Sequence, residues 1–201
     1  MAKPLEYFLF RLYSIAVKNW LIDNVYLSSY PESDNITVAY TTPDRAWAKY
    51  IYPTLNGATT SPNINFHLTG IEYSEGENIL GFVRDHIPVI GSTKIRELKA
   101  PLIYKLTYSC SLYTRTQSEM DVILYQLVSK AHKNAKAVLR VDGQWAELHA
   151  GDPTDETNLE PGEAQDIIQR FGMNLVIPRA YLPLDYTEAE RIGTIDLEYD
   201  V

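Results

Sequence analysis

Hydrophobic and polar residues alternate most regularly between residues 102 and 113. Every second position there is apolar or aromatic: Leu102, Tyr104, Leu106, Tyr108, Cys110 and Leu112. Polar residues fall between most of them: Lys105, Thr107, Ser109 and Ser111. Because successive side chains of a strand point to opposite faces of a sheet, this alternation predicts a strand with one buried face.

The period changes from two to that of a helix at Thr116. Thr116 and Glu119 have the spacing of a capping box, in which each side chain accepts a hydrogen bond from a backbone N–H of the first turn. Apolar residues then recur every three or four positions: Met120, Ile123, Leu124, Leu127, Val128 and Ala131. The pattern predicts a central helix that ends near Lys133.

Arg115 lies between this strand and this helix. Its guanidinium offers a planar fork of hydrogen-bond donors. The side chain could pair with a nearby carboxylate and fix the turn, or it could contact a neighbouring subunit. The sequence leaves both roles open, and we treat Arg115 as a candidate interface residue.

Similar patterns predict the other elements of the chain. An apolar stripe over residues 5–21 indicates an N-terminal helix, and β-branched residues at 36–42 indicate a short strand before Pro43. Residues 63–73 alternate until Gly70 shifts the apolar phase, which predicts a strand with a β-bulge.

The last third of the chain predicts a hairpin and a strand. The Asp142-Gly143 pair favours a tight turn between two strands. A final strand begins near Ile167 and is expected to end before Pro178. The element order gives an α+β fold with a mostly antiparallel sheet flanked by an N-terminal helix and a central helix. We expect a single domain over residues 1–183 and a C-terminal arm over 184–201.

Residues 74–100 form a long connection without a sustained period. Gly and Pro interrupt it repeatedly, yet it carries apolar residues that include Phe82 and Val83. Such a connection is unusual in a compact domain and predicts a binding loop or an excursion to a neighbouring subunit.

The C-terminal segment 193–201 has the alternation of a short strand. Its apolar positions are Ile195, Leu197, Tyr199 and Val201, and acidic residues occupy the positions between them. The strand could return to its own sheet or add to that of a neighbouring subunit. We favour the neighbouring subunit, because the polar stretch 185–191 before it resembles a connecting arm.

Charge and cysteine content restrict the function classes. The formal net charge of the 201 residues is −8, which disfavours a nonspecific grip on phosphate backbones. The single cysteine, Cys110, lies in the apolar register of its strand and is expected to be a core residue. Charged and polar residues interrupt the apolar N-terminus, so we expect a soluble, unexported protein without a membrane span.

Motifs for catalysis, cofactor binding or metal binding do not occur in the sequence. The four histidines are scattered, and no nucleotide-binding glycine pattern is present. A cluster of acidic residues at 152–166 could hold Ca²⁺ but lacks the EF-hand pattern, so a solvated loop is the preferred interpretation. We therefore expect no catalytic, cofactor or metal site, and a structural or binding role. The 15 tyrosines suit interfaces as well as sheets, and Tyr26, Tyr30, Tyr50 and Tyr52 are interface candidates.

The order of several pieces resembles the tail terminator family of tailed bacteriophages, in particular the tail completion and sheath stabiliser proteins of contractile tails. The pieces are "ITVAYTT" at 36–42, "INFHL" at 64–68, the run from Pro101 through "LYTR" to Gln126-Leu127, and "RFGMNLVIPRAYLP" at 170–183. The chain departs from the family pattern in the Asp142-Gly143 hairpin, the acidic loop and the tail after Pro183.

The resemblance implies a virion structural protein rather than an enzyme. Such a protein forms a hexameric ring that caps the tail tube, anchors the last sheath ring and joins the tail to neck or connector proteins. It is assembled in the bacterial cytoplasm and ends at the tail-neck junction. Genome DNA would pass through its lumen without specific binding, and acidic charge would suit that passage. Another neck connector or a baseplate adaptor is the alternative, because a fold does not fix a position in an assembly.

Overall fold

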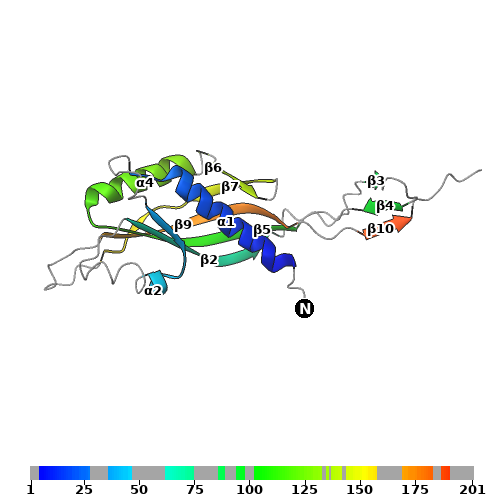
Figure 1. Cartoon of the computed structure of the whole chain (residues 1–201), viewed down its shortest axis with the longest axis horizontal. Coiled ribbons are helices and arrows are strands. Elements are labelled where there is room, and N and C mark those ends of the chain that lie inside the picture. Colours follow the sequence, from blue (N-terminus) through cyan, green and yellow to red (C-terminus); the bar gives the residue numbers. More distant parts are fainter. Residues whose placement is uncertain are drawn as a thin grey trace, which may run out of the picture. The chain divides into compact units, whose positions relative to one another are not determined.

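The structure, a computed structural model, describes residues 5–27, 36–46, 62–74, 86–88, 94–97, 102–132, 135, 137–141, 144–157, 169–182 and 187–190. The chain divides into two compact units (Figure 1). The first unit comprises Met1–Tyr73 and Tyr104–Ala180, and the second comprises Ser74–Ile103 and Tyr181–Val201. The two segments that the sequence set apart, 74–100 and 184–201, thus belong to the same unit. The predicted domain boundaries at 183 and 184 stay a prediction.

A mixed sheet of seven strands forms the framework of the first unit. The strands are β1 (Thr37–Tyr40), β2 (Asn63–Tyr73), β5 (Leu102–Thr114), β6 (Ala137–Val141), β7 (Gln144–Ala150), β8 (Thr154–Asp155) and β9 (Gln169–Leu182). Their order is β1-β2-β5-β9-β7-β6, and β8 pairs with β9. β1 and β2 are parallel, and β2 with β5, β6 with β7, and β9 with both β7 and β8 are antiparallel. The predicted α+β class with a mostly antiparallel sheet is confirmed.

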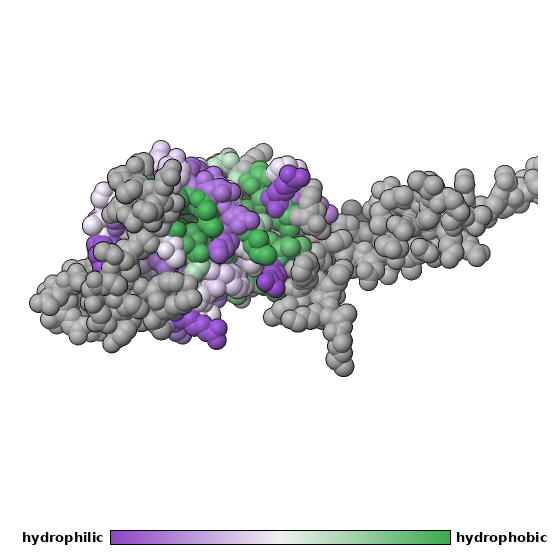
Figure 2. All heavy atoms as spheres, viewed as in Figure 1, coloured by the Kyte–Doolittle hydropathy of each residue, from purple (hydrophilic) through white to green (hydrophobic). Residues whose placement is uncertain are grey.

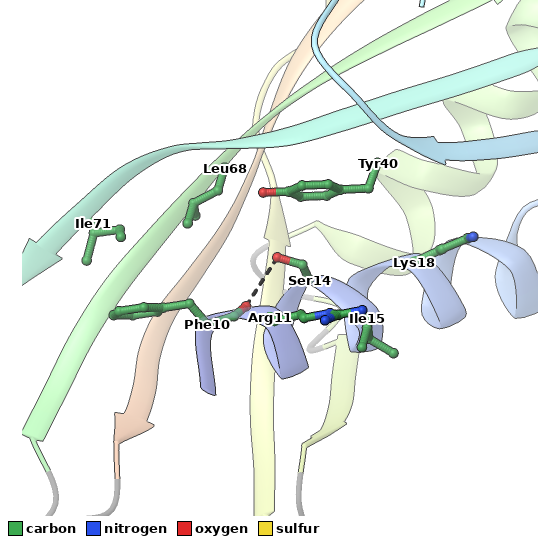
Figure 3. A pocket seen from close by; sticks show the side chains of 8 residues that line it. All are labelled: Phe10, Arg11, Ser14, Ile15, Lys18, Tyr40, Leu68 and Ile71. Atoms are coloured by element: carbon green, nitrogen blue, oxygen red, sulfur yellow. Dashed lines mark hydrogen bonds between the residues drawn. The ribbon is translucent and has the colours of Figure 1, made fainter. Parts of the chain in front are cut away.

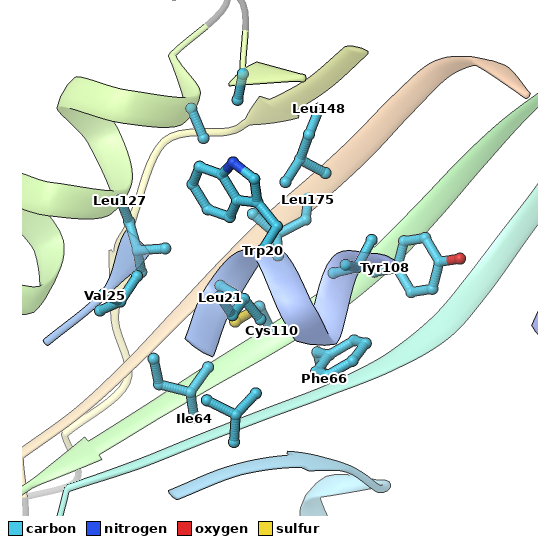
Figure 4. Packing of buried hydrophobic residues seen from close by; sticks show 14 of the residues in the cluster. Trp20, Leu21, Val25, Ile64, Phe66, Tyr108, Cys110, Leu127, Leu148 and Leu175 are labelled. Carbon is cyan, nitrogen blue, oxygen red and sulfur yellow. The ribbon is translucent and has the colours of Figure 1, made fainter. Parts of the chain in front are cut away.

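Two long helices cover one face of this sheet. α1 (Leu5–Asn24) contacts β1, β6 and α4 (Gln117–Ala131), and α4 contacts β7. A short helix, α2 (Pro43–Ala46), follows β1 and contacts β2. Figure 4 shows Trp20 and Leu21 of α1 packed among side chains of α4 and the strands. The N-terminal helix is confirmed and runs three residues beyond the predicted end at residue 21.

Local sequence signals account for the start of α4. Thr116 is the N-cap, and its side-chain oxygen accepts a hydrogen bond from Glu119 N at 3.3 Å. The Glu119 carboxylate accepts from Thr116 N, also at 3.3 Å, which completes the predicted capping box. Met120, Ile123, Leu127 and Ala131 are fully buried, as the apolar stripe predicts.

The predicted irregularity in β2 is present. The pairing of β2 with β5 shifts register between Leu68 and Gly70, which leaves Thr69 as the extra residue of a bulge. Before the bulge Ile64 and Phe66 are fully buried. After the bulge, Ile71 and Tyr73 continue the apolar alternation, but both are exposed. The bulge therefore divides β2 into a buried half and an exposed half.

The second unit contains a sheet of three short strands. Its order is β10 (Thr187–Glu190), β4 (Lys94–Glu97), β3 (His86–Pro88), and both pairs are antiparallel. No strand was predicted within 74–100, so β3 and β4 correct that expectation. β10 lies within the stretch 185–191 that was interpreted as a connecting arm. The three strands carry little apolar alternation, and β10 pairs with a segment about 90 residues earlier in the chain, which is beyond the reach of a local pattern.

The last long strand also differs from expectation. β9 continues through Pro178 to Leu182, although the sequence predicted its end before Pro178. The β7 pairs of β9 involve Leu175 and Val176, so Pro178 follows the paired stretch on that side. A proline there does not cost a hydrogen bond to β7, because its missing N–H is not needed.

Candidate functional site

A mostly apolar groove of about 600 Å³ lies in the first unit between α1 and the strands β1 and β2. Figure 3 shows the helix residues on one side and the strand residues on the other. The groove is lined by Phe10, Arg11, Ser14, Ile15, Lys18, Tyr40, Leu68 and Ile71. All eight belong to the same unit, so the groove is a feature of one compact body.

The groove is open because large apolar side chains on both walls remain exposed. Ile71, which follows the β2 bulge, is 47% exposed, and Ile15 on α1 is 44% exposed. Tyr40 at the end of β1 is 52% exposed and packs edge-on against the buried Phe66, with ring centroids 5.3 Å apart. Such a concentration of exposed apolar surface typically marks a binding surface.

Aromatic rings form one end of this region. Phe10 lies edge-on to Tyr104 with ring centroids 6.0 Å apart, and Tyr73 packs on the same Tyr104 ring at 5.4 Å. Tyr73 is itself largely exposed. The three rings hold α1 against the exposed half of β2 and its partner β5, and so keep the groove walls in place.

The floor of the groove contains a short hydrogen-bond chain. Ser14 Oγ donates to the carbonyl of Phe10 at 3.2 Å and lies 3.4 Å from the hydroxyl of Tyr108. Since the serine proton is used in the first bond, the Tyr108 hydroxyl is the donor in the second. Burial raises the pKa of Tyr108 above its ordinary value of 10.0, so the phenol stays protonated and able to donate.

The charged residues at the groove are both cations. Arg11 and Lys18 are exposed on α1, and none of the described residues that line the groove is acidic. Figure 2 shows hydrophobic and hydrophilic residues interleaved on the face that carries α1. An apolar trough with a cationic edge can bind an extended segment that has apolar side chains on one side and carboxylates on the other.

The predicted interface residues fall in two groups. Arg115 is exposed in the turn between β5 and α4, and its backbone N–H donates to Glu119 Oε2 at 3.3 Å. The structure therefore places its backbone in the capping arrangement. Phe82, Val83, Ile195, Leu197, Tyr199 and Val201 lie outside the described residues. Their role stays a prediction.

One tyrosine interface candidate, Tyr26, is described. It is 51% exposed, its backbone N–H and carbonyl both bond to the Gln126 side chain of α4, and Lys130 lies 5.0 Å from its ring centroid. These contacts tie the end of α1 to α4, and Tyr26 stays half-exposed. Tyr30, Tyr50 and Tyr52 lie outside the described residues.

The two chemical sites that the sequence considered have structural explanations. Cys110 is buried, and burial raises its pKa to about 12, so its thiol is protonated and inert at neutral pH. In the acidic loop, Glu156 Oε2 lies 2.9 Å from Arg170 Nε, an ion pair without the alignment of a hydrogen bond. Within the described part of the chain no group of three possible metal ligands occurs.

No local sequence pattern predicted the groove. The alternation of β2 predicted Ile71 and Tyr73 as continuing the apolar face, and a local pattern does not tell whether a helix covers that face. The change of phase at Gly70 was the available signal, because bulges often occur where a strand leaves the core.

No protein-family model and no curated protein matches this chain. One similar solved structure is the sheath/tube terminator of an extracellular contractile injection system, PVC, in its extended state, with a TM-score of 0.45 and 10% identity over 95% of this chain and 62% of that chain. Another is the tube-terminating cap of the anti-feeding prophage, with a TM-score of 0.43 and 14% identity over 94% of this chain and 60% of that one. This chain thus spans about three fifths of the length of both.

Among the described residues, no helix combines the length and the hydrophobicity that a membrane span needs.

Proposed function

We propose that this chain is a structural protein of a contractile tail, forming a ring that closes the end of the tail tube. In this role it anchors the last sheath ring and joins the tail to the neck of a phage particle. Six copies make the ring. The role requires neither a catalytic site nor a cofactor, and assembly would take place in the bacterial cytoplasm.

The observation that carries the proposal is the placement of the pieces that resemble the tail terminator family. Along the sequence these pieces are separated by long stretches. In the fold they fall on β1, β2, β5 and β9, which are consecutive neighbours in the sheet, and on α4, which packs over it. Pieces that form one contiguous framework support a common architecture better than scattered local likenesses do.

The exposed apolar surface also supports a role in assembly. Beyond the groove, Tyr125 on α4 is 74% exposed and Trp145 on β7 is 65% exposed. Trp145 stacks under Arg140 of the edge strand β6, with 5.9 Å between the guanidinium carbon and the ring centroid. Exposed Trp, Tyr and Arg are typical of the anchors that protein–protein interfaces use.

Within the ring, the proposed contacts come from three segments. Arg115 contacts the adjacent copy, Phe82 and Val83 contact a neighbouring subunit or the tube, and Ile195, Leu197, Tyr199 and Val201 bind a neighbouring subunit. The net charge of −8 is compatible with DNA passing through the lumen without being held, because like charges repel.

Removal of the chain from the particle tests the proposal. Particles assembled without it should carry tubes of irregular length whose sheath is not anchored at the end, because nothing stops tube growth. Re-supplying the full chain should restore uniform tails. Tails of normal length with a normal sheath in its absence would contradict the proposal.

The alternative position is that of a neck connector or a baseplate adaptor. A connector would leave complete, capped tails that fail to join heads. A baseplate adaptor would leave no tails at all, because the tube starts from the baseplate. Electron micrographs of the same particles distinguish these outcomes.

A further inference from the structure

The groove between α1 and β2 favours a partner with negative charge. The charged residues among its eight lining residues are Arg11 and Lys18, whereas the whole chain carries a net charge of −8. Two cations beside an apolar trough are too few for a nucleic-acid site, which needs a series of phosphate contacts. They fit a short acidic peptide that also has apolar side chains.

The chain itself contains such a peptide in residues 193–201, "GTIDLEYDV". In an extended conformation its alternate side chains point to opposite sides. Four apolar residues then occupy one side: Ile195, Leu197, Tyr199 and Val201. The three acidic residues, Asp196, Glu198 and Asp200, occupy the other side.

The spacing of the cations on α1 lies between the two spacings that the carboxylates of the segment offer. Arg11 and Lys18 are seven residues apart on α1, which corresponds to roughly 10 Å along the helix axis. Acidic residues two positions apart on an extended segment are separated by roughly 7 Å, and those four apart by roughly 13 Å. A segment that lies along α1 therefore brings two carboxylates within reach of the two long cationic side chains.

We infer that the groove of each copy holds residues 193–201 of a neighbouring copy, with the apolar side chains in the trough and the carboxylates toward Arg11 and Lys18. This inference rests on the proposed ring, because a closed ring supplies every groove with one neighbouring C-terminus. The groove thereby identifies the acceptor for the C-terminal strand, and the ring is linked by exchanged tails.

Disulfide trapping between two full-length variants tests the inference. One variant carries Ile71→Cys in the groove, and the other carries Leu197→Cys in the tail. Val138→Cys is the matched control, because Val138 on the edge strand β6 is 48% exposed and Ile71 is 47% exposed. The native Cys110 does not interfere, since it is buried with a raised pKa.

Mixing and oxidising the two populations should give a disulfide-linked dimer with the groove variant and lose it with the control. A chain carrying both cysteines should give a ladder of linked copies. A closed loop within one chain would overturn the inference, since the tail would then occupy its own groove. An absent link would also overturn it, and the same groove could then be tested against the tube subunit.

Sedimentation of the same samples separates this inference from the proposed function. A ring that forms without the disulfide contradicts the inference but leaves the proposed function standing. A linked pair that never forms a ring supports the groove as acceptor and contradicts the ring. If neither the disulfide link nor the ring forms, both the inference and the proposed function are contradicted.

A charge exchange provides a second measurement that does not depend on cysteine geometry. Lys18→Glu should reduce trapping, and combining it with Glu198→Lys in the partner should restore it, because the attraction is rebuilt with reversed signs. Raising the salt concentration should weaken trapping in both arrangements. Trapping that is unaffected by Lys18→Glu would contradict the proposed pairing of charges.

Discussion

Two faces of α1 meet the same sheet in different ways. On one face, Val17 and Leu21 are fully buried in the core, and Figure 4 shows Leu21 among side chains of α4 and the strands. On the other face, Ile15 lines a groove whose opposite wall contains the half-exposed Ile71 (Figure 3). Both faces carry apolar residues, so the presence of apolar residues does not distinguish them.

The β2 bulge accounts for much of this difference. Ile64 and Phe66 precede it and lie under the helix layer, whereas Ile71 and Tyr73 follow it and remain largely exposed. The closed face therefore supplies stability, and the open face keeps apolar surface available for a partner. Substitutions on either side of the bulge test this division of roles.

Truncation of Phe66 should be strongly destabilising. The ring is fully buried and packs against Tyr40 and Tyr108, so Phe66→Ala should lower the free energy of unfolding by about 3–5 kcal/mol. Ile71→Ala, on the same strand beyond the bulge, should change it by less than about 1 kcal/mol. Urea denaturation measures both. Similar losses for the two variants would mean that the bulge does not separate core from groove.

Alkaline pH should destabilise the fold through Cys110. Its pKa is raised by burial from 9.0 to about 12, so between these values the thiol is protonated when folded and ionised when unfolded. The unfolded state then binds fewer protons, and stability falls as the pH rises above 9, by up to about 1.4 kcal/mol per pH unit for this group.

Denaturation curves from pH 7 to above pH 9 check this expectation. Cys110→Ala should show a shallower alkaline loss than the natural chain, while the raised pKa of Tyr108 continues to act in both. The slopes are compared, not the absolute stabilities, because the substitution also leaves a small cavity. Equal slopes would show that the thiol is not held in a dry environment.

The cap of α4 should have an intermediate effect. Thr116→Ala removes the side-chain oxygen that accepts from Glu119 N and should cost about 1 kcal/mol of stability. Ser118→Ala, at an exposed position in the first turn of the same helix, is the control and should have little effect. Helix loss by circular dichroism should accompany the lower stability. A loss confined to the control would refute the capping box as the reason for the helix start.

Arg115 tests whether the turn between β5 and α4 has a role beyond stability. Because its side chain is exposed and its backbone bond to Glu119 survives substitution, Arg115→Ala should change stability by less than about 0.5 kcal/mol. Ring assembly, followed by sedimentation, should be weakened more than folding. Lys105→Ala is the control, since it removes a cation from an exposed ion pair with Glu72. Unchanged oligomer size with a lower melting temperature would favour an intramolecular role.

Local signals predicted most of the first unit. The alternation of β5, the capping box at Thr116 and the phase change at Gly70 each express a rule that acts within a few residues, and each is present in the structure. The hairpin of β6 and β7 follows the same logic, since Val141 pairs with Gln144. Such features are determined by neighbours in sequence, so a single sequence contains them.

Features that depend on distant segments were missed. β10 is formed by "TEAE", which has no apolar alternation and owes its structure to pairing with β4. The continuation of β9 past Pro178 depends on where β7 stops pairing. The groove depends on which half of β2 is covered by α1. None of these properties is encoded in the local pattern, and the interface residues at 82–83 and 195–201 stay predictions.

The most direct test of the central claim is a cryo-EM reconstruction of the tail end in complete particles. We expect a ring of this chain at the end of the tube, in contact with tube and sheath, with an extended segment from the adjacent copy in each groove beside Arg11 and Lys18. Density for the chain at the baseplate, or as single copies away from the tube end, would contradict the proposed function. A ring with empty grooves would leave the function standing and contradict the exchange of tails.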